Sequence, residues 1–425
     1  MTYAELLKRL VGARRFGVKL GLERMRELLD RLAIDGVAPD RRLGTVVHIA
    51  GTNGKGSTVA MVAALARSTG ARVATYTSPH LSTLRERVTI DGAMVSEDDV
   101  VAAADRVAAA GGDELTFFEQ VTAIAMVLIA ERAADVTVLE VGLGGRLDAT
   151  NVVAAPIAAV TGVALDHEAI LGGTLGAIAF EKAGIFKPGQ RAFVGASGEP
   201  VAVPLLVKHA RDAGVAQLHV IDEAAADALA ALPLAMAGAH QRRNAALALA
   251  IADVLAAPAP AGVGVLPRAP DRGALATLVH PGRFEIAGDL ILDGAHNPHG
   301  ARALAAAVRE RGVRPVLVLA VSADKDVRSI VEPLVPVVSA VIATRYQQER
   351  ALDPDQLAAV LREVEGDAVV ETASDLASAV ARARQLGGPV LVAGSLFLVG
   401  EARSLLLGAP SDPLFVTDPP ARPTA

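Results

Sequence analysis

The stretch "VVHIAGTNGKGSTVAMVAALA", Val46–Ala66, decides the fold, because an apolar run changes there into a glycine-rich loop and then into helix-like sequence. The loop departs from the common G-x-x-x-x-G-K-[ST] pattern: Gly56 separates Lys55 from the hydroxyl residues, and Ile49 stands where the first glycine belongs. Its three glycines allow close backbone approach, and the free N–H groups of a helix start favour an anion. The stretch predicts a strand, a phosphate-binding loop and a helix, with a plain strand-to-helix turn as the alternative.

The same alternation of short β-branched runs and longer alanine- and leucine-rich stretches continues beyond this point. It predicts an α/β fold with a mainly parallel sheet covered by helices. The expected strands of the first half are Val46–Ala50, Arg72–Thr75, Val136–Val141, Ile157–Val163 and Arg191–Val194. The expected helices include Ser57–Ser68, Phe118–Ala133 and Thr174–Ala183.

A segment rich in proline, alanine and glycine covers Ala257–Leu275, and the alternation restarts after it. We therefore expect an N-terminal P-loop-containing domain over residues 1–280, a linker at 281–288, and a smaller Rossmann-like α/β domain over 289–425. The proline-rich end, from about residue 410, is expected to be a loose tail. The expected strands of the second domain are Leu290–Leu292, Val316–Val321, Ala340–Ala343, Ala368–Glu371 and Pro389–Val392.

Composition excludes several classes of protein. The net charge of −6, without a basic block, argues against nucleic acid as a partner, and the 3% of aromatic residues against a base-stacking platform. The first residues lack the apolar core of a signal peptide, and no later run approaches the roughly 18 apolar residues of a membrane span. With no cysteine, disulfides, thiolate metal sites and a cysteine nucleophile are excluded. We expect a cytoplasmic protein without a membrane partner.

A carboxylate stands at the end of a second expected strand. Glu140 interrupts an apolar run and is followed by Gly142, Gly144 and Gly145. An ionised carboxylate in that position is costly unless it is paired or bound to a cation. Beside a phosphate loop it predicts Mg²⁺ ligation, with a salt-bridged core glutamate as the alternative.

A third strand end carries Asp166 and His167, at the sheet edge where open α/β proteins bind ligands. The following helix places Lys182 beside Ile178 on a face that otherwise looks apolar. Such a lysine either has a functional role or extends to solvent or to an acid near Glu181.

These motifs, with others along the chain, carry a family resemblance. The stretches are "HIAGTNGKGST", "TSPHL" followed by "RERVTIDG", "TFFEQVT", "LEVGLGGRLDATN", "LDHEAILGGTLGAIAFEKAGIFK", "GAHQRRNAALA", "PGRFEI", "DGAHNPHGA", "DKD" and "GSLFLVGE". They resemble the folylpolyglutamate and dihydrofolate synthases of the Mur ligase superfamily, in that family's order, from about Gly21 to about Glu401.

The resemblance implies a Mur-type ATP-binding domain followed by a glutamate-ligase domain, and an ATP-dependent carboxylate–amine ligase. ATP phosphorylates a carboxylate of the pterin substrate, and the amine of L-glutamate attacks the acyl phosphate, releasing ADP and phosphate. The substrates would be dihydropteroate and reduced folates, the latter extended through γ-linked glutamates, and the enzyme a monomer. Alternatives are a single-function folylpolyglutamate synthase, a peptidoglycan-precursor ligase, and a P-loop ATPase that acts as a switch.

The resemblance also implies site residues. Those implied for the ATP phosphates are Asn53, Gly54, Lys55, Gly56, Ser57 and Thr58, and those for the rest of the nucleotide are Asn244, Arg283 and Asp293. Two Mg²⁺ ions are implied, with Ser57, Ser78, Glu140 and His167 as ligands. Catalytic roles fall to Lys55, His167 and Lys182, and Lys182 matches a lysine that carries a CO₂-derived carbamate in this family.

The implied pterin and folate contacts are Thr116, Phe117, Phe118, Glu119, Leu147, Asp148 and Ala149. His296 and Asn297 belong to the motif implied for the glutamate-ligase domain. Near the N-terminus the chain departs from the best-known bifunctional pattern, since Arg14, Arg15 and Phe16 stand where that pattern has small polar residues. This departure leaves single and dual function open.

Overall fold

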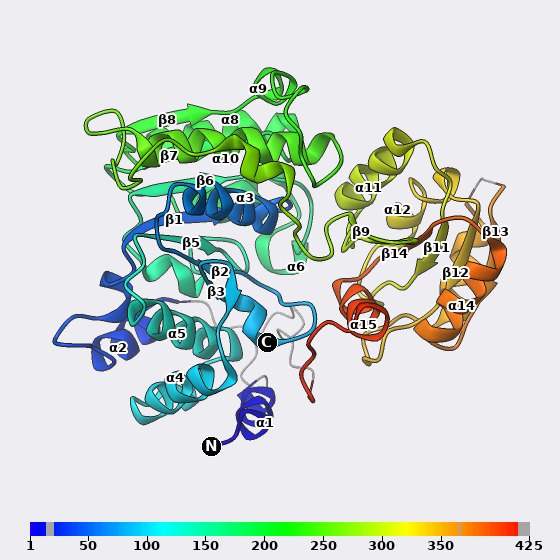
Figure 1. Ribbon diagram of the computed structural model, residues 1–425, viewed down its shortest axis with the longest axis horizontal. Coiled ribbons are helices and arrows are strands. Elements are labelled where there is room, and N and C mark those ends of the chain that lie inside the picture. The colour runs from blue at the N-terminus through cyan, green and yellow to red at the C-terminus, as the bar shows by residue number, and fades with distance from the viewer. Residues whose placement is uncertain (14–20, 365–366, 415–425) are drawn as a thin grey trace. The chain divides into compact units, whose positions relative to one another are not determined.

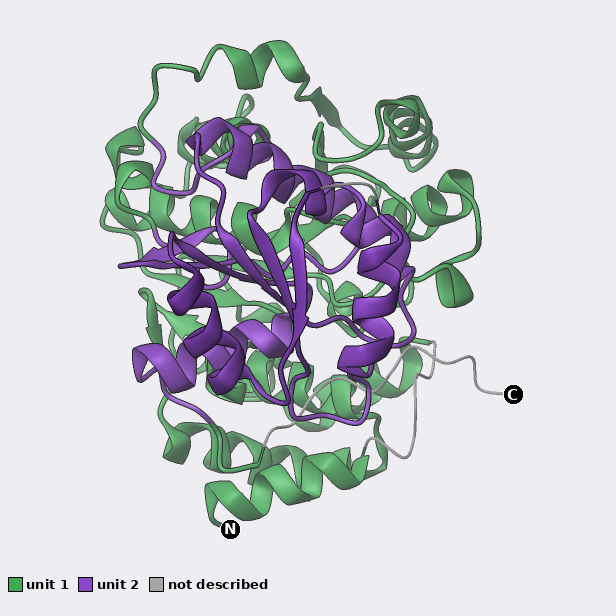
Figure 2. Cartoon of the chain, turned by 90° about the vertical axis from the view of Figure 1, so that its right-hand side faces the viewer, with its two compact units in different colours: residues 1–233, 242–278, 412–425 green, residues 234–241, 279–411 purple. Residues whose placement is uncertain are grey.

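The computed structural model of the 425-residue chain describes residues 1–13, 21–364 and 367–414. The chain forms two compact units, which Figure 2 shows in green and purple. Unit 1 comprises residues 1–233, 242–278 and the described residues after Ser411, and unit 2 comprises residues 234–241 and 279–411. The departure noted at Arg14–Phe16 lies outside the described residues.

Unit 1 contains an eight-stranded sheet in the order β4-β3-β2-β5-β1-β6-β7-β8 (Figure 1). The β2–β3 and β3–β4 pairs are antiparallel and all other pairs are parallel. The strands are β1 (Thr45–Ala50), β2 (Val73–Tyr76), β3 (Val88–Ile90), β4 (Ala93–Met94), β5 (Val136–Glu140), β6 (Ile157–Val160), β7 (Arg191–Val194) and β8 (Gln217–Val220). Because β1 is central, its carboxyl end lies where parallel sheets bind ligands.

Helices of unit 1 bury apolar faces against this sheet. Helix α5, "FFEQVTAIAMVLIA", is buried along nearly its whole length and belongs to one apolar core, while α7 and α8 belong to another. The helices are α1 (Tyr3–Ala13), α2 (Glu23–Arg31), α3 (Lys55–Ser68), α4 (Glu97–Ala109), α5 (Phe117–Ala130), α6 (Glu168–Leu171), α7 (Leu175–Ala183), α8 (Val203–Asp212), α9 (Glu223–Asp227) and α10 (Ala239–Ala256). Among the described helices, none is both long and apolar enough to cross a bilayer.

Unit 2 contains a six-stranded sheet in the order β13-β12-β11-β14-β10-β9, in which only the β9–β10 pair is antiparallel. Its strands are β9 (Glu285–Ala287), β10 (Leu290–Leu292), β11 (Val316–Leu319), β12 (Ala340–Ala343), β13 (Val369–Thr372) and β14 (Val390–Ala393). Its helices are α11 (Pro298–Arg311), α12 (Val327–Val331), α13 (Pro354–Arg362), α14 (Leu376–Leu386) and α15 (Leu396–Leu407). The expected α/β class with two mainly parallel sheets is confirmed.

Among the described residues after α15, Asp412 differs from the expected loose tail. The carboxylate of Asp412 accepts hydrogen bonds from Thr83 and Leu84 in unit 1. Its backbone N–H donates to the carbonyl of Ser82. Asp412 is therefore fixed to unit 1 and does not extend the second domain.

Candidate functional site

The glycine loop, residues 51–54, joins the carboxyl end of β1 to the start of α3. Gly51 has φ 149° and Gly54 has φ 82°, in a region that residues with a side chain rarely adopt. A Cβ on Gly51 would overlap the hydroxyl of Thr161, and one on Gly54 would overlap the side chain of Asn244. Helix α3 starts at Lys55, two residues earlier than expected, so its first-turn N–H groups open directly onto this loop.

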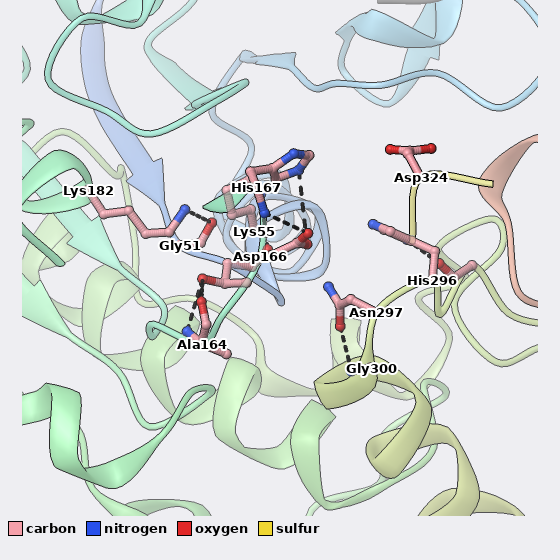
Figure 3. A network of polar contacts seen from close by, with 12 residues as sticks. Gly51, Lys55, Ala164, Asp166, His167, Lys182, His296, Asn297, Gly300 and Asp324 are labelled. Carbon is pink, nitrogen blue, oxygen red and sulfur yellow. Dashed lines mark hydrogen bonds and ion pairs between the residues drawn. The ribbon is translucent and has the colours of Figure 1, made fainter. Parts of the chain in front are cut away.

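Hydroxyl side chains fix this loop against the end of β6. Thr161 Oγ1 donates to the carbonyl of Asn53 across 2.6 Å. Thr52 Oγ1 donates to the carbonyl of Ala164 (3.1 Å) and accepts from its N–H (3.0 Å), as Figure 3 shows at Ala164. Thr52 and Thr161 are not among the residues implied by the sequence, although both stand next to a glycine at a strand end.

Beside this loop lie two further residues that are implied for nucleotide binding, Lys55 and Asn244. Lys55 is half-buried, and its ammonium group donates to the carbonyl of Thr52 at 3.3 Å. Asn244, on α10, is buried, and its side-chain oxygen accepts from Ser197 Oγ at 2.8 Å. The positive charge, the helix start and the amide are thus gathered around one loop. Such an arrangement suits a phosphate group.

Lys182 points toward the same loop. Its side chain is 4% exposed on α7, and Nζ donates to the carbonyl of Gly51 across 3.1 Å (Figure 3). Burial, assisted by the charge of Lys55, lowers the pKa of Lys182 to about 7, although Asp166 and Asp148 act in the opposite direction. Glu181 is bound elsewhere, since it pairs with Arg146 at 2.8 Å.

A serine and a carboxylate meet where β2 and β5 end. The backbone N–H of Ser78 donates to Glu140 Oε2 at 3.2 Å, and both residues are buried, Ser78 with 8% and Glu140 with 5% of its surface exposed. Ser78 Oγ is buried and has no hydrogen-bond partner in the part of the chain that the structure describes. A buried hydroxyl oxygen next to a buried carboxylate is a donor set that fits a hard divalent cation.

His167 caps the short helix α6 in a left-handed conformation, with φ 53°. Its N–H donates to Asp166 Oδ1 (2.9 Å), and its ring Nε2 lies 4.0 Å from Asp166 Oδ2. The imidazole is 39% exposed, whereas the Asp166 side chain is 8% exposed. Within residues 1–13, 21–364 and 367–414, no three His, Asp or Glu side chains are grouped closely enough to hold a metal ion.

The implied pterin contacts include a helix cap. Thr116 caps α5, and its hydroxyl and N–H both donate to Glu119, at 2.6 and 2.9 Å. Glu119 also pairs with Arg24 of α2 at 2.9 Å. The neighbouring Phe117 is fully buried, with the Arg87 guanidinium 5.4 Å from its ring centre. Thr116, Phe117 and Glu119 thus contribute directly to the stability of α5.

The other implied pterin residues lie near the loop after β5. Phe118 is half-buried and packs against Gly142, where a Cβ would overlap the ring. Asp148 accepts from the N–H groups of Leu143 (2.9 Å) and Thr150 (3.0 Å), and burial raises its pKa although these hydrogen bonds oppose the shift. Leu147 is half-buried and Ala149 is buried beside it.

In unit 2, the implied residues gather around the loop after β10. Asp293 accepts from the N–H groups of Phe284 (2.8 Å) and Ala295 (2.9 Å). Burial raises the pKa of Asp293, and the positive charge of Arg283 opposes that rise. Arg283 donates to the carbonyl of Gly282 at 3.2 Å.

The same loop runs into α11. Asn297 caps this helix, with Oδ1 accepting from the Gly300 N–H at 2.7 Å (Figure 3). A ring nitrogen of His296 lies 2.7 Å from the carbonyl of Gly294. The two residues of the implied glutamate-ligase motif are therefore held at a helix start.

Two family models match the chain. Residues 49–199 match the Mur ligase middle domain, and residues 282–396 match the glutamate ligase domain of Mur ligases. The first match covers the glycine loop, Glu140 and Lys182, and the second covers Arg283 and Asp293. The chain thus contains a middle domain and a glutamate ligase domain of the Mur ligase class.

Curated relatives narrow this class. The dihydrofolate synthase/folylpolyglutamate synthase of Escherichia coli is 34% identical, with 92% of each chain covered. That of Mycobacterium tuberculosis is also 34% identical, over 90% of this chain and 89% of the relative. A probable bifunctional folylpolyglutamate synthase/dihydropteroate synthase of Haloferax volcanii is 36% identical over 95% of this chain. The chain spans about half the length of that relative and of a similar one from Halobacterium salinarum.

Solved structures of enzymes from the same family are similar to this chain. E. coli FolC in complex with DHPP and ADP has a TM-score of 0.81 at 30% identity, covering 96% of this chain and 98% of that one. The Yersinia pestis bifunctional enzyme complexed with AMPPNP and Mn ion has a TM-score of 0.82 at 31% identity with the same coverage. The chain belongs to the dihydrofolate synthase/folylpolyglutamate synthase family of Mur ligases.

Proposed function

We propose that the protein is an ATP-dependent carboxylate–amine ligase that adds L-glutamate to dihydropteroate and to reduced folates. The observation that carries this proposal is the buried amine of Lys182 on the Gly51 carbonyl, at the loop that opens onto α3. The relatives named as dihydrofolate synthase/folylpolyglutamate synthase support the same reaction.

The reaction divides one difficult step into two easier ones. A carboxylate oxygen of the pterin substrate attacks the γ-phosphorus of ATP, and ADP leaves. The amine of glutamate then attacks the acyl carbon, loses a proton, and expels phosphate to leave an amide. The N–H groups at the start of α3 and the charge of Lys55 would bind and orient the phosphates. Catalysis is mostly positioning and charge neutralisation.

Divalent metal ions fit the donors present. Ser78 Oγ is a buried oxygen without a hydrogen-bond partner among the described residues, and the buried carboxylate of Glu140 lies against the Ser78 backbone. We propose that these two residues hold one Mg²⁺ and that His167 contributes to a second. The ions would neutralise phosphate charge. The Yersinia pestis structure complexed with AMPPNP and Mn ion supports a divalent cation with nucleotide.

Carbamylation of Lys182 belongs to the same proposal. A neutral amine attacks CO₂ and loses a proton, which leaves an anionic carbamate. With a pKa of about 7, roughly half of the Lys182 side chains are neutral at pH 7, whereas an ordinary lysine is almost wholly protonated. The carbamate would be an anion close to the charge of Lys55, and it would help to orient a magnesium ion.

One assay tests the proposed function. Dihydropteroate and tetrahydrofolate are offered separately with ATP, Mg²⁺ and radiolabelled glutamate. Label in both products supports dual function, and label with only tetrahydrofolate leaves a single-function folylpolyglutamate synthase. Phosphate release that continues without glutamate, with no labelled product, would overturn the ligase and favour a P-loop ATPase switch.

The remaining expectations stay predictions. They are a monomeric enzyme of the cytoplasm, with small-molecule substrates and without nucleic acid or membrane as partner. Sedimentation with and without ATP and folate tests the monomer.

A further inference from the structure

Asp412 makes four hydrogen bonds to segments far away in the sequence. Its carboxylate accepts from Thr83 Oγ1 (2.7 Å), from the Leu84 N–H (2.8 Å) and from the hydroxyl of Tyr3 on α1 (3.1 Å). Its own N–H donates to the carbonyl of Ser82 at 2.9 Å. All of these partners belong to unit 1. One carboxylate therefore joins α1 and the end of the described chain to the segment around residue 83.

That segment is the 78–87 loop, which begins with Ser78 and ends in the short 3-10 helix Leu84–Arg87. Internal hydrogen bonds make it a compact unit. The Glu86 carboxylate accepts from the N–H groups of Leu81, Ser82 and Thr83, at 2.7, 2.9 and 3.0 Å. At its beginning, the Ser78 N–H donates to Glu140.

Hydrogen bonds also join the beginning and the end of the loop. Arg87, which is 1% exposed, donates from Nε to His80 Nδ1 at 2.9 Å. The carbonyl of Arg87 accepts from the N–H of Thr77 at 2.9 Å. A displacement at Thr83 or Leu84 should therefore reach Ser78 through these contacts instead of being absorbed by a flexible chain.

We infer that Asp412 is a positioning residue that holds the 78–87 loop, and with it the Ser78 hydroxyl, in place beside Glu140. The inference rests on the proposed function, because it takes Ser78 as a ligand of the divalent cation. Charge-assisted hydrogen bonds to a carboxylate are the strong ones, and the two oxygens of Asp412 fix both a side chain and a backbone group of the loop.

Asp412→Asn is the primary test, because it keeps the shape but replaces one acceptor oxygen with a donor amide. Ser411→Ala, a change at the exposed neighbouring residue, is the control. We expect Asp412→Asn to weaken Mn²⁺ binding to the enzyme–nucleotide complex about five- to tenfold, measured by electron paramagnetic resonance. Hydrogen exchange in the metal-free protein should become faster within residues 78–86, while nucleotide affinity in EDTA stays within about twofold.

A tether with a purely structural role predicts something else. It would lower the melting temperature and leave the Mn²⁺ affinity and the exchange of residues 78–86 as in the wild type. That result would overturn the inference.

Thr83→Val covers the case in which Asp412→Asn fails to fold, because it removes a single hydroxyl and keeps the carboxylate. We expect Thr83→Val to weaken Mn²⁺ binding as well. If Asp412 and Thr83 act through the same contact, the Mn²⁺ affinity of the double variant should be at most about twofold lower than that of the weaker single variant. Additive effects would indicate independent roles and contradict it. If the wild-type protein shows no glutamate ligation in the radiolabel assay, the proposed function fails. If the wild type ligates glutamate but Asp412→Asn leaves the Mn²⁺ affinity unchanged, only the role of Asp412 is rejected.

Discussion

The amine of Lys182 donates a hydrogen bond to the backbone carbonyl of Gly51 across 3.1 Å, which joins helix α7 to the first residue of the glycine loop. This contact places a lysine with a pKa of about 7 beside the group that precedes the start of α3. Burying a lysine that stays protonated is costly, because a charged ammonium group is removed from water. A protonated lysine also does not react readily with CO₂ at neutral pH. Changes at the glycine loop are therefore expected to affect Lys182, and changes at Lys182 to affect the loop.

Replacing Lys182 with alanine should abolish most ligation and leave the fold intact. The side chain is buried, and its hydrogen bond is made to a loop that Thr52 and Thr161 also fix in place. We expect kcat to fall at least about 100-fold, with a circular dichroism spectrum like that of the wild type. Lys208→Ala, at an exposed lysine on α8, is the matched control. Near-normal turnover of Lys182→Ala would reject the carbamate.

The lowered pKa of Lys182 predicts how carbamylation depends on pH. Because burial lowers the pKa to about 7, the neutral amine rises from about a tenth of the molecules at pH 6 to about nine-tenths at pH 8. A carbamate signal in ¹³C NMR with labelled CO₂ should increase over this range. The Lys182→Ala variant should lack it. A signal that increases only above pH 9 would mean that the amine has an ordinary pKa.

Lys55→Ala should weaken ATP binding, because its charge lies at the glycine loop. We expect the affinity for ATP to decrease about tenfold or more, measured by calorimetry. The charge of Lys55 also helps to lower the pKa of Lys182, so the carbamate signal should move to higher pH in this variant. Unchanged affinity and rate would remove Lys55 from the site.

Ser78→Ala separates metal binding from stability. It removes a buried oxygen that has no hydrogen-bond partner among the described residues, so thermal stability should stay equal or increase slightly. The Mg²⁺ concentration for half-maximal activity should rise about tenfold. Ser404→Ala, a serine on α15, serves as the control. A drop in stability without a change in Mg²⁺ dependence would exclude Ser78 as a ligand.

Thr161→Val tests the support of the glycine loop. Valine keeps the shape but loses the hydrogen bond to the Asn53 carbonyl. We expect a loss of about 1–2 kcal/mol in the free energy of unfolding, because a carbonyl loses its partner, and a several-fold weaker affinity for ATP. Denaturant titration and calorimetry measure the two. ATP affinity equal to that of the wild type would show that the loop keeps its conformation without this hydroxyl.

Sequence patterns predicted the interior strands best. Strands β7, β10 and β12 have the expected bounds, because each is a short, mostly buried apolar run. The edge strand β8 was overlooked, since "QLHV" is only partly buried and contains polar residues. Strand β6 ends at Val160, three residues early, because Gly162 turns the chain with φ 156°.

The sequence predicts several residues of the site, but not the contacts that hold these residues in place. The glycines, Lys55 and Lys182 could be chosen because their sequence context is unusual. Thr161 and Asp412 act through partners more than 100 positions away, at Asn53 and Thr83, and no local pattern indicates such contacts. Glu119 completes a helix cap and pairs with Arg24, and these contacts too are evident only from the structure.

The strand order of unit 2 has a consequence for synthesis on the ribosome. Strand β14, the last to be made, lies between β10 and β11, which do not pair with each other. Until residues 390–393 have emerged, both of these apolar strands keep an unsatisfied edge, and the sheet is divided into two parts. A nascent chain stalled before Val390 should therefore depend on chaperones, even though all its other strands are complete.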